Sequence, residues 1–169
     1  MQDTFELGKK IAPLASPKLR QMTTNIDSKH TVLYADDDTD DLELVKEVFH
    51  KHSRNVDIVC VNNGLQAVEF LESFPDDQNP PCLIILDINM PRLNGKQALE
   101  RIRKMNRFEN SPVILFTTST HPLDKSFAEK YNAGFITKPI DYTQMHMIAD
   151  IFLDHCAEDI RKAIRKPTN

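Results

Sequence analysis

The sequence has no tryptophan, only four glycines and only three cysteines among its 169 residues. Cys60, Cys82 and Cys156 form neither a Cys-x-x-Cys pair nor a metal-ligand spacing, which argues against a disulfide framework and a zinc site. The apolar run of about 20 residues that a transmembrane helix needs is missing, and so is the apolar core of an N-terminal signal peptide. These absences predict a protein of the reducing cytoplasm that does not enter a membrane.

The net charge is only −4, which argues against a nucleic-acid-binding surface. With 40% hydrophobic residues, the chain has the composition of one globular domain with short appendages. We expect a flexible arm or a disordered leader over residues 1–29, a domain with an extended last helix over residues 30–165 and a tail over residues 166–169. The arm carries Leu7, Ile11 and Leu14 at helical spacing, but Pro13 would interrupt a helix there.

The strongest local pattern is an apolar run that ends in a single aspartate, Asp87. Residues 82–86 are all apolar, and Pro91 and Gly95 follow as turn signals. An unbroken apolar run of this length predicts a strand that is buried on both faces, as in a parallel sheet. Ligands of open α/β sheets bind beyond the carboxyl ends of such strands, so Asp87 is a candidate site residue.

Apolar strand patterns alternate with helical periodicity along the rest of the chain. We expect strands at residues 31–35, 56–61, 82–86, 113–116 and 135–137, and helices at residues 39–51, 65–74, 96–105, 122–132 and 142–165. Short connections between them require right-handed crossovers and a parallel sheet covered on both faces. The predicted fold class is therefore α/β, a doubly wound five-stranded parallel sheet with the strand order 2-1-3-4-5.

This topology brings four strand ends to one edge of the sheet, and they carry Asp36 and Asp37, Asp87, Thr117 and Lys138. Three carboxylates at one place repel each other unless a cation joins them, and Mg²⁺ prefers such oxygen ligands. A lysine and a hydroxyl at the same edge can hold an added anion. The set predicts a carboxylate that accepts a phosphoryl group, with a metal and a lysine compensating the charge.

Residues 30 to about 153 resemble the receiver domain of two-component response regulators, which has a flavodoxin-like or CheY-like fold. The shared motifs are an acidic pair after the first strand, Asp-x-x-Met-Pro-x-x-x-Gly from Asp87 to Gly95, Thr117 after the fourth strand and Lys138-Pro139 after the fifth. A weaker resemblance, in residues 36–41, 91–92 and 117–119, is to the stand-alone receivers that partner bacterial phytochromes.

The resemblance implies a role for each site residue. Asp87 would be the phosphoacceptor, and Mg²⁺ or Mn²⁺ would be bound by the side chains of Asp37 and Asp87, by the backbone carbonyl of Asn89 and, largely through water, by Asp36.

Two further residues would contact the phosphoryl oxygens, namely Lys138 and Thr117. Phe135 would be the aromatic residue that reorients when Thr117 moves, and the Lys138–Pro139 peptide bond would be cis.

The implied protein is a single-domain response regulator rather than an enzyme, although it would catalyse its own phosphorylation and dephosphorylation. It would receive the phosphoryl group from a sensor histidine kinase or a phosphotransfer protein. Because only about 30 residues follow Lys138, we expect output through a downstream protein target or onward phosphotransfer, with no nucleic acid or membrane involved.

Four alternatives compete with this interpretation. A haloacid-dehalogenase-type phosphatase needs a second aspartate where the chain has Asn89, and an EF-hand loop needs glycine where it has Asp41. A nucleotide-binding domain needs a glycine-rich phosphate loop, which no predicted strand precedes. A receiver-like interaction domain that is never phosphorylated stays open, and it predicts no Mg²⁺ binding at Asp87.

The last predicted helix, at residues 142–165, is longer than the sheet can cover. It would span roughly 35 Å, against about 17 Å for a five-residue strand. Its apolar residues nevertheless continue to Cys156, Ile160 and Ile164. We therefore expect residues 156–164 to pack on another surface, a second copy in a homodimer or, alternatively, the N-terminal arm.

Overall fold

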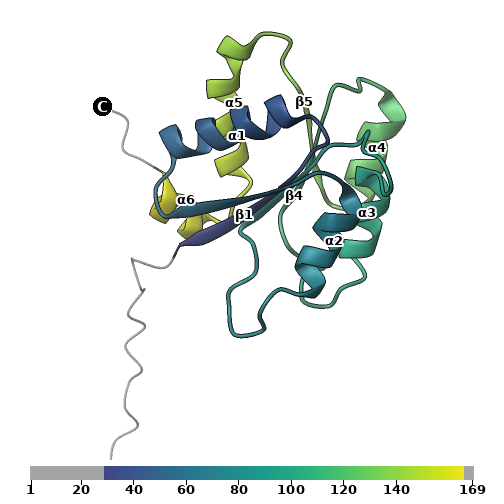
Figure 1. Ribbon diagram of the computed structural model, residues 1–169, viewed down its shortest axis with the longest axis horizontal. Helices are drawn as coiled ribbons and strands as arrows, with labels where there is room; N and C mark the ends of the chain where they lie inside the picture. The colour runs from purple at the N-terminus through teal and green to yellow at the C-terminus, as the bar shows by residue number, and fades with distance from the viewer. Residues whose placement is uncertain (1–28, 166–169) are drawn as a thin grey trace, which may run out of the picture.

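The computed structural model describes residues 29–165, and its centre is a parallel sheet of five strands (Figure 1). The strand order is β2-β1-β3-β4-β5, which confirms the predicted fold class. The strands are β1 (His30–Ala35), β2 (Val56–Val61), β3 (Leu83–Leu86), β4 (Val113–Thr117) and β5 (Gly134–Thr137).

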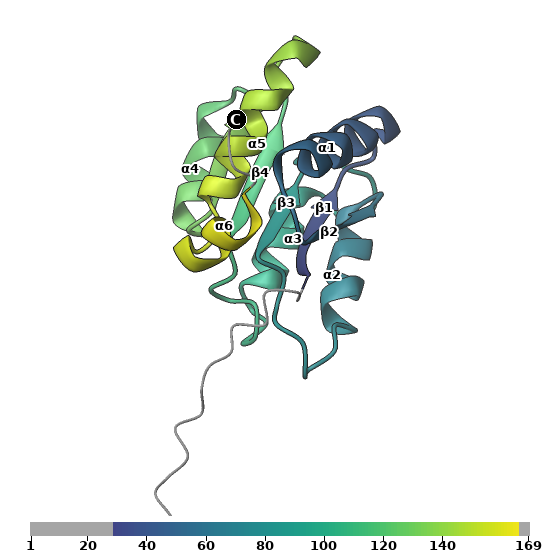
Figure 2. The same ribbon diagram turned by 90° about the vertical axis from the view of Figure 1, so that its left-hand side faces the viewer.

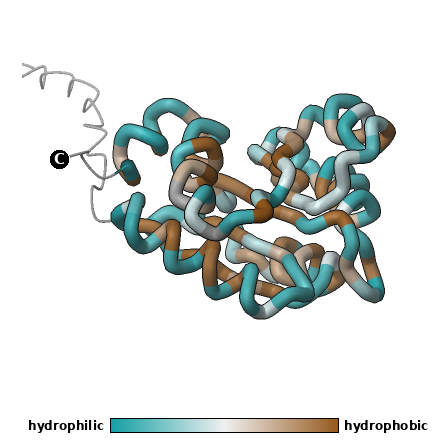
Figure 3. The backbone as a smooth tube through the Cα atoms, turned by 90° about the horizontal axis from the view of Figure 1, so that it is seen from above, coloured by the Kyte–Doolittle hydropathy of each residue, from teal (hydrophilic) through white to brown (hydrophobic). Residues whose placement is uncertain are grey.

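Helices cover both faces of this sheet (Figures 1 and 2). They are α1 (Thr39–His52), α2 (Gly64–Glu72), α3 (Gly95–Ile102), α4 (Pro122–Lys130), α5 (Met145–Asp154) and α6 (Glu158–Ile164), with a short 3₁₀ turn at Tyr142–Gln144. One apolar core lies between the sheet and α1, α5 and α6, and a second core lies between the sheet and α2, α3 and α4. We call these the α1–α5 face and the α2–α4 face. Seen from above, the hydrophobic segments run through the middle of the molecule and the hydrophilic ones lie on its outside (Figure 3).

Side-chain caps fix where the helices begin. The carboxylate of Asp38 accepts hydrogen bonds from the backbone N–H groups of Asp40 and Asp41, so α1 starts immediately beyond β1. Asn94 and Gln97 form a capping box at the start of α3. These starts agree with the sequence prediction, whereas α3 ends about three residues earlier than expected.

Strand register places the candidate residues side by side. Ala35 of β1 pairs with Leu86 of β3, so the residues that follow them, Asp36 and Asp87, emerge next to each other at the carboxyl edge of the sheet. All four residues of β3 are fully buried, which explains their unbroken apolar sequence.

The prediction of one continuous helix over residues 142–165 is wrong. The helix stops at Asp154, His155 still has helical backbone angles, and Ala157 is extended before α6 begins. The chain contains no glycine or proline at this bend. The bend lets the apolar residues beyond the sheet turn back against the domain's own core.

The premise for packing residues 156–164 on a second copy, an apolar stripe left exposed beyond the sheet, is wrong for the same reason. Cys156 and Ile164 are buried in the core of the α1–α5 face, and Ile160 packs against it. The end of α6 is also tied to the turn after α1, because the backbone N–H of Arg54 donates to the Ile164 carbonyl at 2.7 Å. The helix therefore completes its own domain.

The N-terminal arm through residue 28 and the tail from residue 166 lie outside the described residues. Within residues 29–165, no helix is both long enough and apolar enough to cross a bilayer.

Candidate functional site

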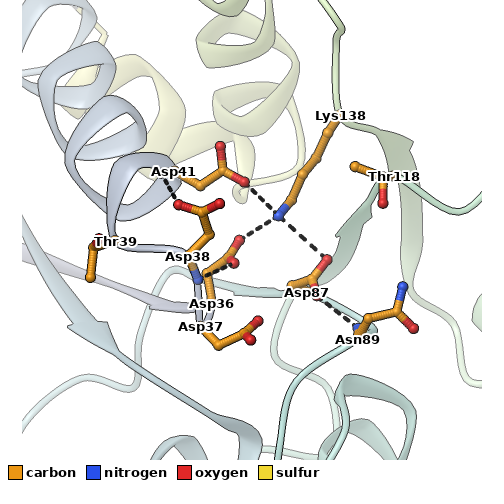
Figure 4. Close-up of a pocket in the computed structure, with 9 residues that line it drawn as sticks. All are labelled: Asp36, Asp37, Asp38, Thr39, Asp41, Asp87, Asn89, Thr118 and Lys138. Carbon is orange, nitrogen blue, oxygen red and sulfur yellow. Dashed lines mark hydrogen bonds and ion pairs between the residues drawn. The ribbon is translucent and has the colours of Figure 1, made fainter.

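A pocket opens at the carboxyl edge of the sheet, where β1, β3, β4 and β5 end and α1 begins (Figure 4). It is polar, and the residues that line it are Asp36, Asp37, Asp38, Thr39, Asp41, Asp87, Asn89, Thr118 and Lys138. The structure thus brings together five of the seven residues predicted from the sequence, Asp36, Asp37, Asp87, Asn89 and Lys138. Thr117 and Phe135 do not line the pocket.

Asp36 forms the floor of the pocket and is buried. Its Oδ2 accepts hydrogen bonds from the Tyr34 hydroxyl and from Lys138 Nζ, the latter at 2.6 Å, and its Oδ1 accepts one from the backbone N–H of Asp38 at 3.1 Å. Both carboxylate oxygens therefore already have protein partners.

Lys138 reaches across the pocket from the end of β5 (Figure 4). Its ammonium group lies 2.6 Å from Asp36, 2.8 Å from Asp41 and 3.5 Å from Asp87 Oδ1. Burial alone would lower the pKa of Lys138, but the hydrogen bonds to Asp36 and Asp41 outweigh it and the pKa is raised. The lysine is therefore charged, and it is the one cation among the residues lining this pocket.

Asp87 lies beyond the end of β3 with its carboxylate in the pocket. Its Oδ2 accepts a hydrogen bond from the backbone N–H of Asn89 at 2.7 Å, while Oδ1 faces Lys138. Burial raises the pKa of Asp87, and the neighbouring Asp36 raises it further against the opposing effect of Lys138. A further positive charge in the pocket would stabilise the ionised form.

Three of the five carboxylates that line the pocket are placed to bind a divalent cation. Oxygen atoms of Asp36, Asp37 and Asp87 all lie within 4.8 Å of one another. Asp36 and Asp87 are buried and Asp37 is exposed, so the group is open to solvent on one side. An all-oxygen, partly solvated donor set suits Mg²⁺ or Mn²⁺, which bind carboxylates and keep several waters.

Thr117 is fully buried, and its hydroxyl accepts a hydrogen bond from the backbone N–H of Ser119 at 3.2 Å. Because side chains alternate along a strand, Thr117 shares the α2–α4 face with Leu115, while Thr118 follows Phe116 onto the α1–α5 face. Thr118 therefore lines the pocket in place of Thr117. Phe135 is partly buried and packs on the core of the α2–α4 face.

Sequence reasoning missed Asp41 and Thr118. The sequence pattern assigns Asp36 and Asp37 to the site and the later acids of this run to the first turn of a helix, and Asp40 and Asp41 do lie in the first turn of α1. A signal for Asp41 existed in the Asp38 cap, which places Asp41 within the first helical turn beside the strand ends. Its carboxylate then reaches Lys138 at 2.8 Å.

Comparison with known proteins agrees with this geometry. The family model of the response regulator receiver domain matches residues 32–150, so the chain belongs to that family. It contains, accordingly, a receiver domain of the two-component signalling type.

Among its relatives is the response regulator Rcp1 of Synechocystis, which is 31% identical over 90 residues, 52% of this chain and 61% of that protein. The chain spans less than two thirds of the length of the first curated relatives. A crystal structure of a response regulator from Legionella pneumophila is 33% identical, with a TM-score of 0.60 over 75% of this chain and 99% of that one. The Mn²⁺-bound form of Rcp1 is 24% identical, with a TM-score of 0.65 over 71% of this chain and 88% of that one.

Proposed function

We propose that this protein is a phosphorylation-controlled signalling protein in which Asp87 accepts a phosphoryl group from a sensor histidine kinase or a phosphotransfer protein. The observation that carries the proposal is the placement of Asp87. Its carboxylate faces Lys138 at 3.5 Å and lies within metal-binding range of Asp36 and Asp37. A nucleophilic carboxylate, a cation and a divalent-metal site in one pocket are the parts that phosphoryl transfer needs.

In the proposed reaction, an oxygen of Asp87 attacks the phosphorus of a phosphohistidine. The new O–P bond forms as the N–P bond to the histidine breaks, and the electron pair stays on the imidazole nitrogen. The backbone N–H of Asn89 orients the Asp87 carboxylate through Oδ2. Oδ1, which lacks a backbone donor, is the better candidate for the attacking atom.

Mg²⁺ or Mn²⁺, when bound, would offset the negative charge that gathers on the phosphoryl oxygens. Asp37 and Asp87 are the residues we assign as direct ligands, with the Asn89 carbonyl. Asp36 has both oxygens engaged by Tyr34, Lys138 and the Asp38 backbone, which supports an indirect role through water. Lys138 would exchange its bonds to Asp36 and Asp41 for the phosphoryl oxygens.

Membership of the receiver family supports the proposed partner proteins. We assign a histidine kinase or phosphotransfer protein as donor and a downstream protein, or onward phosphotransfer, as output. Thr117 and Phe135 are assigned to the switch that would report the phosphoryl group to that partner. All three cysteines are free, which supports a reducing, cytoplasmic location.

The test is incubation with acetyl phosphate and Mg²⁺, followed by intact mass. We expect the wild-type protein to gain the mass of one phosphoryl group and the Asp87→Asn variant to gain none, because the amide is not a nucleophile. Asp77→Asn, at an exposed aspartate, is the matched control and should behave as wild type. Equal uptake by the wild type and the Asp87→Asn variant would refute the assignment, and no uptake by any of the three would favour an unphosphorylated interaction domain.

A further inference from the structure

Three polar side chains join α3 to α4 on the α2–α4 face. Lys96 Nζ lies 2.7 Å from Asp124 Oδ1, and the Ser119 hydroxyl donates to Asp124 Oδ2 at 2.5 Å. Asp124 is buried although it carries a charge. The hydrogen bonds from Lys96 and Ser119 lower its pKa, so both oxygens are held as acceptors. We call Lys96, Ser119 and Asp124 the α3–α4 latch.

The Lys96 end of the latch lies next to the backbone of Asp87, the proposed phosphoacceptor. Lys96 is the second residue of α3, and the residue before it, Gly95, donates its N–H to the Ile88 carbonyl at 3.1 Å. A Cβ atom on Gly95 would lie 2.0 Å from the carbonyl oxygen of Asp87. The start of α3 therefore rests directly on the backbone of Asp87 and cannot shift independently of it.

The other end of the latch holds the switch threonine. Ser119 donates its backbone N–H to Thr117 Oγ1 at 3.2 Å. The Ser119 side chain is itself bound twice, because it also accepts the backbone N–H of His121 at 3.2 Å. Ser119 is thus immobilised by its side chain while its backbone engages the Thr117 hydroxyl on the face of the sheet away from the pocket.

We propose that the α3–α4 latch holds the Thr117 hydroxyl away from Asp87 and so sets how readily the protein enters its phosphorylated state. This inference rests on the proposed function. For Thr117 to bond a phosphoryl oxygen, its hydroxyl must leave the Ser119 N–H, and the segment that carries Ser119 is anchored to Asp124. The phosphoryl group can shift this equilibrium only by as much as it favours the released state over the latched one.

Weakening the latch should therefore favour phosphorylation. In Asp124→Asn the charged acceptor is replaced by a neutral side chain of the same shape. We expect it to take up phosphoryl from acetyl phosphate roughly fivefold faster than wild type, a change of the size of one hydrogen bond. Lys96→Met, which removes the latch from its other end, should act in the same direction.

Two variants serve as matched controls. Glu129→Gln neutralises an exposed acid on the same helix and should react at the wild-type rate. Ser119→Thr keeps the hydroxyl that donates to Asp124 and should also stay near wild type. A second readout needs no phosphoryl group, because amide hydrogen exchange at Ser119 should be slow in wild type and several-fold faster in Asp124→Asn.

The outcomes separate the two claims. If wild type and Asp124→Asn are phosphorylated at the same rate, or the variant is slower, the latch does not restrain the switch and the inference is overturned. Unchanged Ser119 exchange in the variant overturns it as well. If wild type takes up no phosphoryl group, the proposed function fails first and the inference falls with it. Thermal melting confirms that each variant is folded, and if Asp124→Asn is unfolded, Lys96→Met decides.

Discussion

The two edges of the sheet are built on opposite principles. At the carboxyl edge, β1 and β3 are followed by acidic side chains, and Lys138 contacts three carboxylates at once. At the amino edge, side chains donate hydrogen bonds to backbone carbonyls and so join neighbouring loops. Arg107 donates to the carbonyls of Phe74, Pro75 and Gln78, and its guanidinium group lies 5.3 Å from the centres of the Phe74 and Phe108 rings.

The comparison indicates that the amino edge contributes mainly to the stability of the fold and the carboxyl edge to binding. The amino edge is tied together by hydrogen bonds to the backbone and buries apolar side chains such as Ile164. The carboxyl edge keeps more negative than positive charge, which an incoming metal ion can neutralise. Three experiments test this contrast.

The largest effect is expected at the amino edge. Ile164→Ala removes a fully buried side chain and leaves a cavity in the core of the α1–α5 face, which should lower the free energy of unfolding by about 3 kcal/mol. The same substitution at Ile140, which is fully exposed beside the pocket, should change it by less than about 0.5 kcal/mol. Urea unfolding measures both. If Ile164→Ala lowers the free energy of unfolding no more than Ile140→Ala does, α6 is not part of the cooperative fold.

An intermediate effect is expected from a metal at the carboxyl edge. Mg²⁺ at about thirty times its Kd should stabilise the folded protein by about 2 kcal/mol, because it binds the folded state alone. Asp37→Ala removes an exposed ligand and should abolish most of this gain, which thermal melting with and without Mg²⁺ will show. Asp77→Ala is the control and should keep the full response. A full response in Asp37→Ala would remove Asp37 from the metal site.

The smallest effect is a stabilisation without metal. Asp87 is buried beside Asp36, and its raised pKa means that the ionised form is disfavoured in the folded protein. Asp87→Asn removes that charge, so in metal-free buffer near neutral pH the variant should melt a few degrees above wild type. Added Mg²⁺ should reverse the order. A variant that melts below wild type in metal-free buffer would contradict the idea that the carboxyl edge is strained by its charges.

The carboxyl edge could be predicted from the sequence because local patterns determine it. Five strand patterns in a parallel order place Asp36, Asp87 and Lys138 at one edge, whatever the details of their packing. The bend between α5 and α6 could not be predicted in this way. Without glycine or proline at residues 155–157, only the burial of Cys156 and Ile164 in their own core decides it, and that is a tertiary effect.

The roles of Thr117, Thr118 and Asp41 also depended on the structure. The position of Thr117 at the end of β4 was predicted, but the face of the sheet to which its hydroxyl points depends on strand alternation and on the Ser119 contact. Asp41 reaches Lys138 only because the Asp38 cap fixes the first turn of α1. The cis form of the Lys138–Pro139 bond stays a prediction.

Strand alternation also has a consequence for how a signal would travel. Asp87 and Lys138, which we propose bind the phosphoryl group, open on the α1–α5 face, whereas Thr117 and Phe135 belong to the α2–α4 face. The signal must therefore cross the sheet, and β4 is the strand that carries Thr118 on one face and Thr117 on the other. A fluorescent dye on α1 would therefore report phosphoryl and metal binding in the pocket, whereas a dye on α4 would report the response of Thr117 and Phe135 on the opposite face.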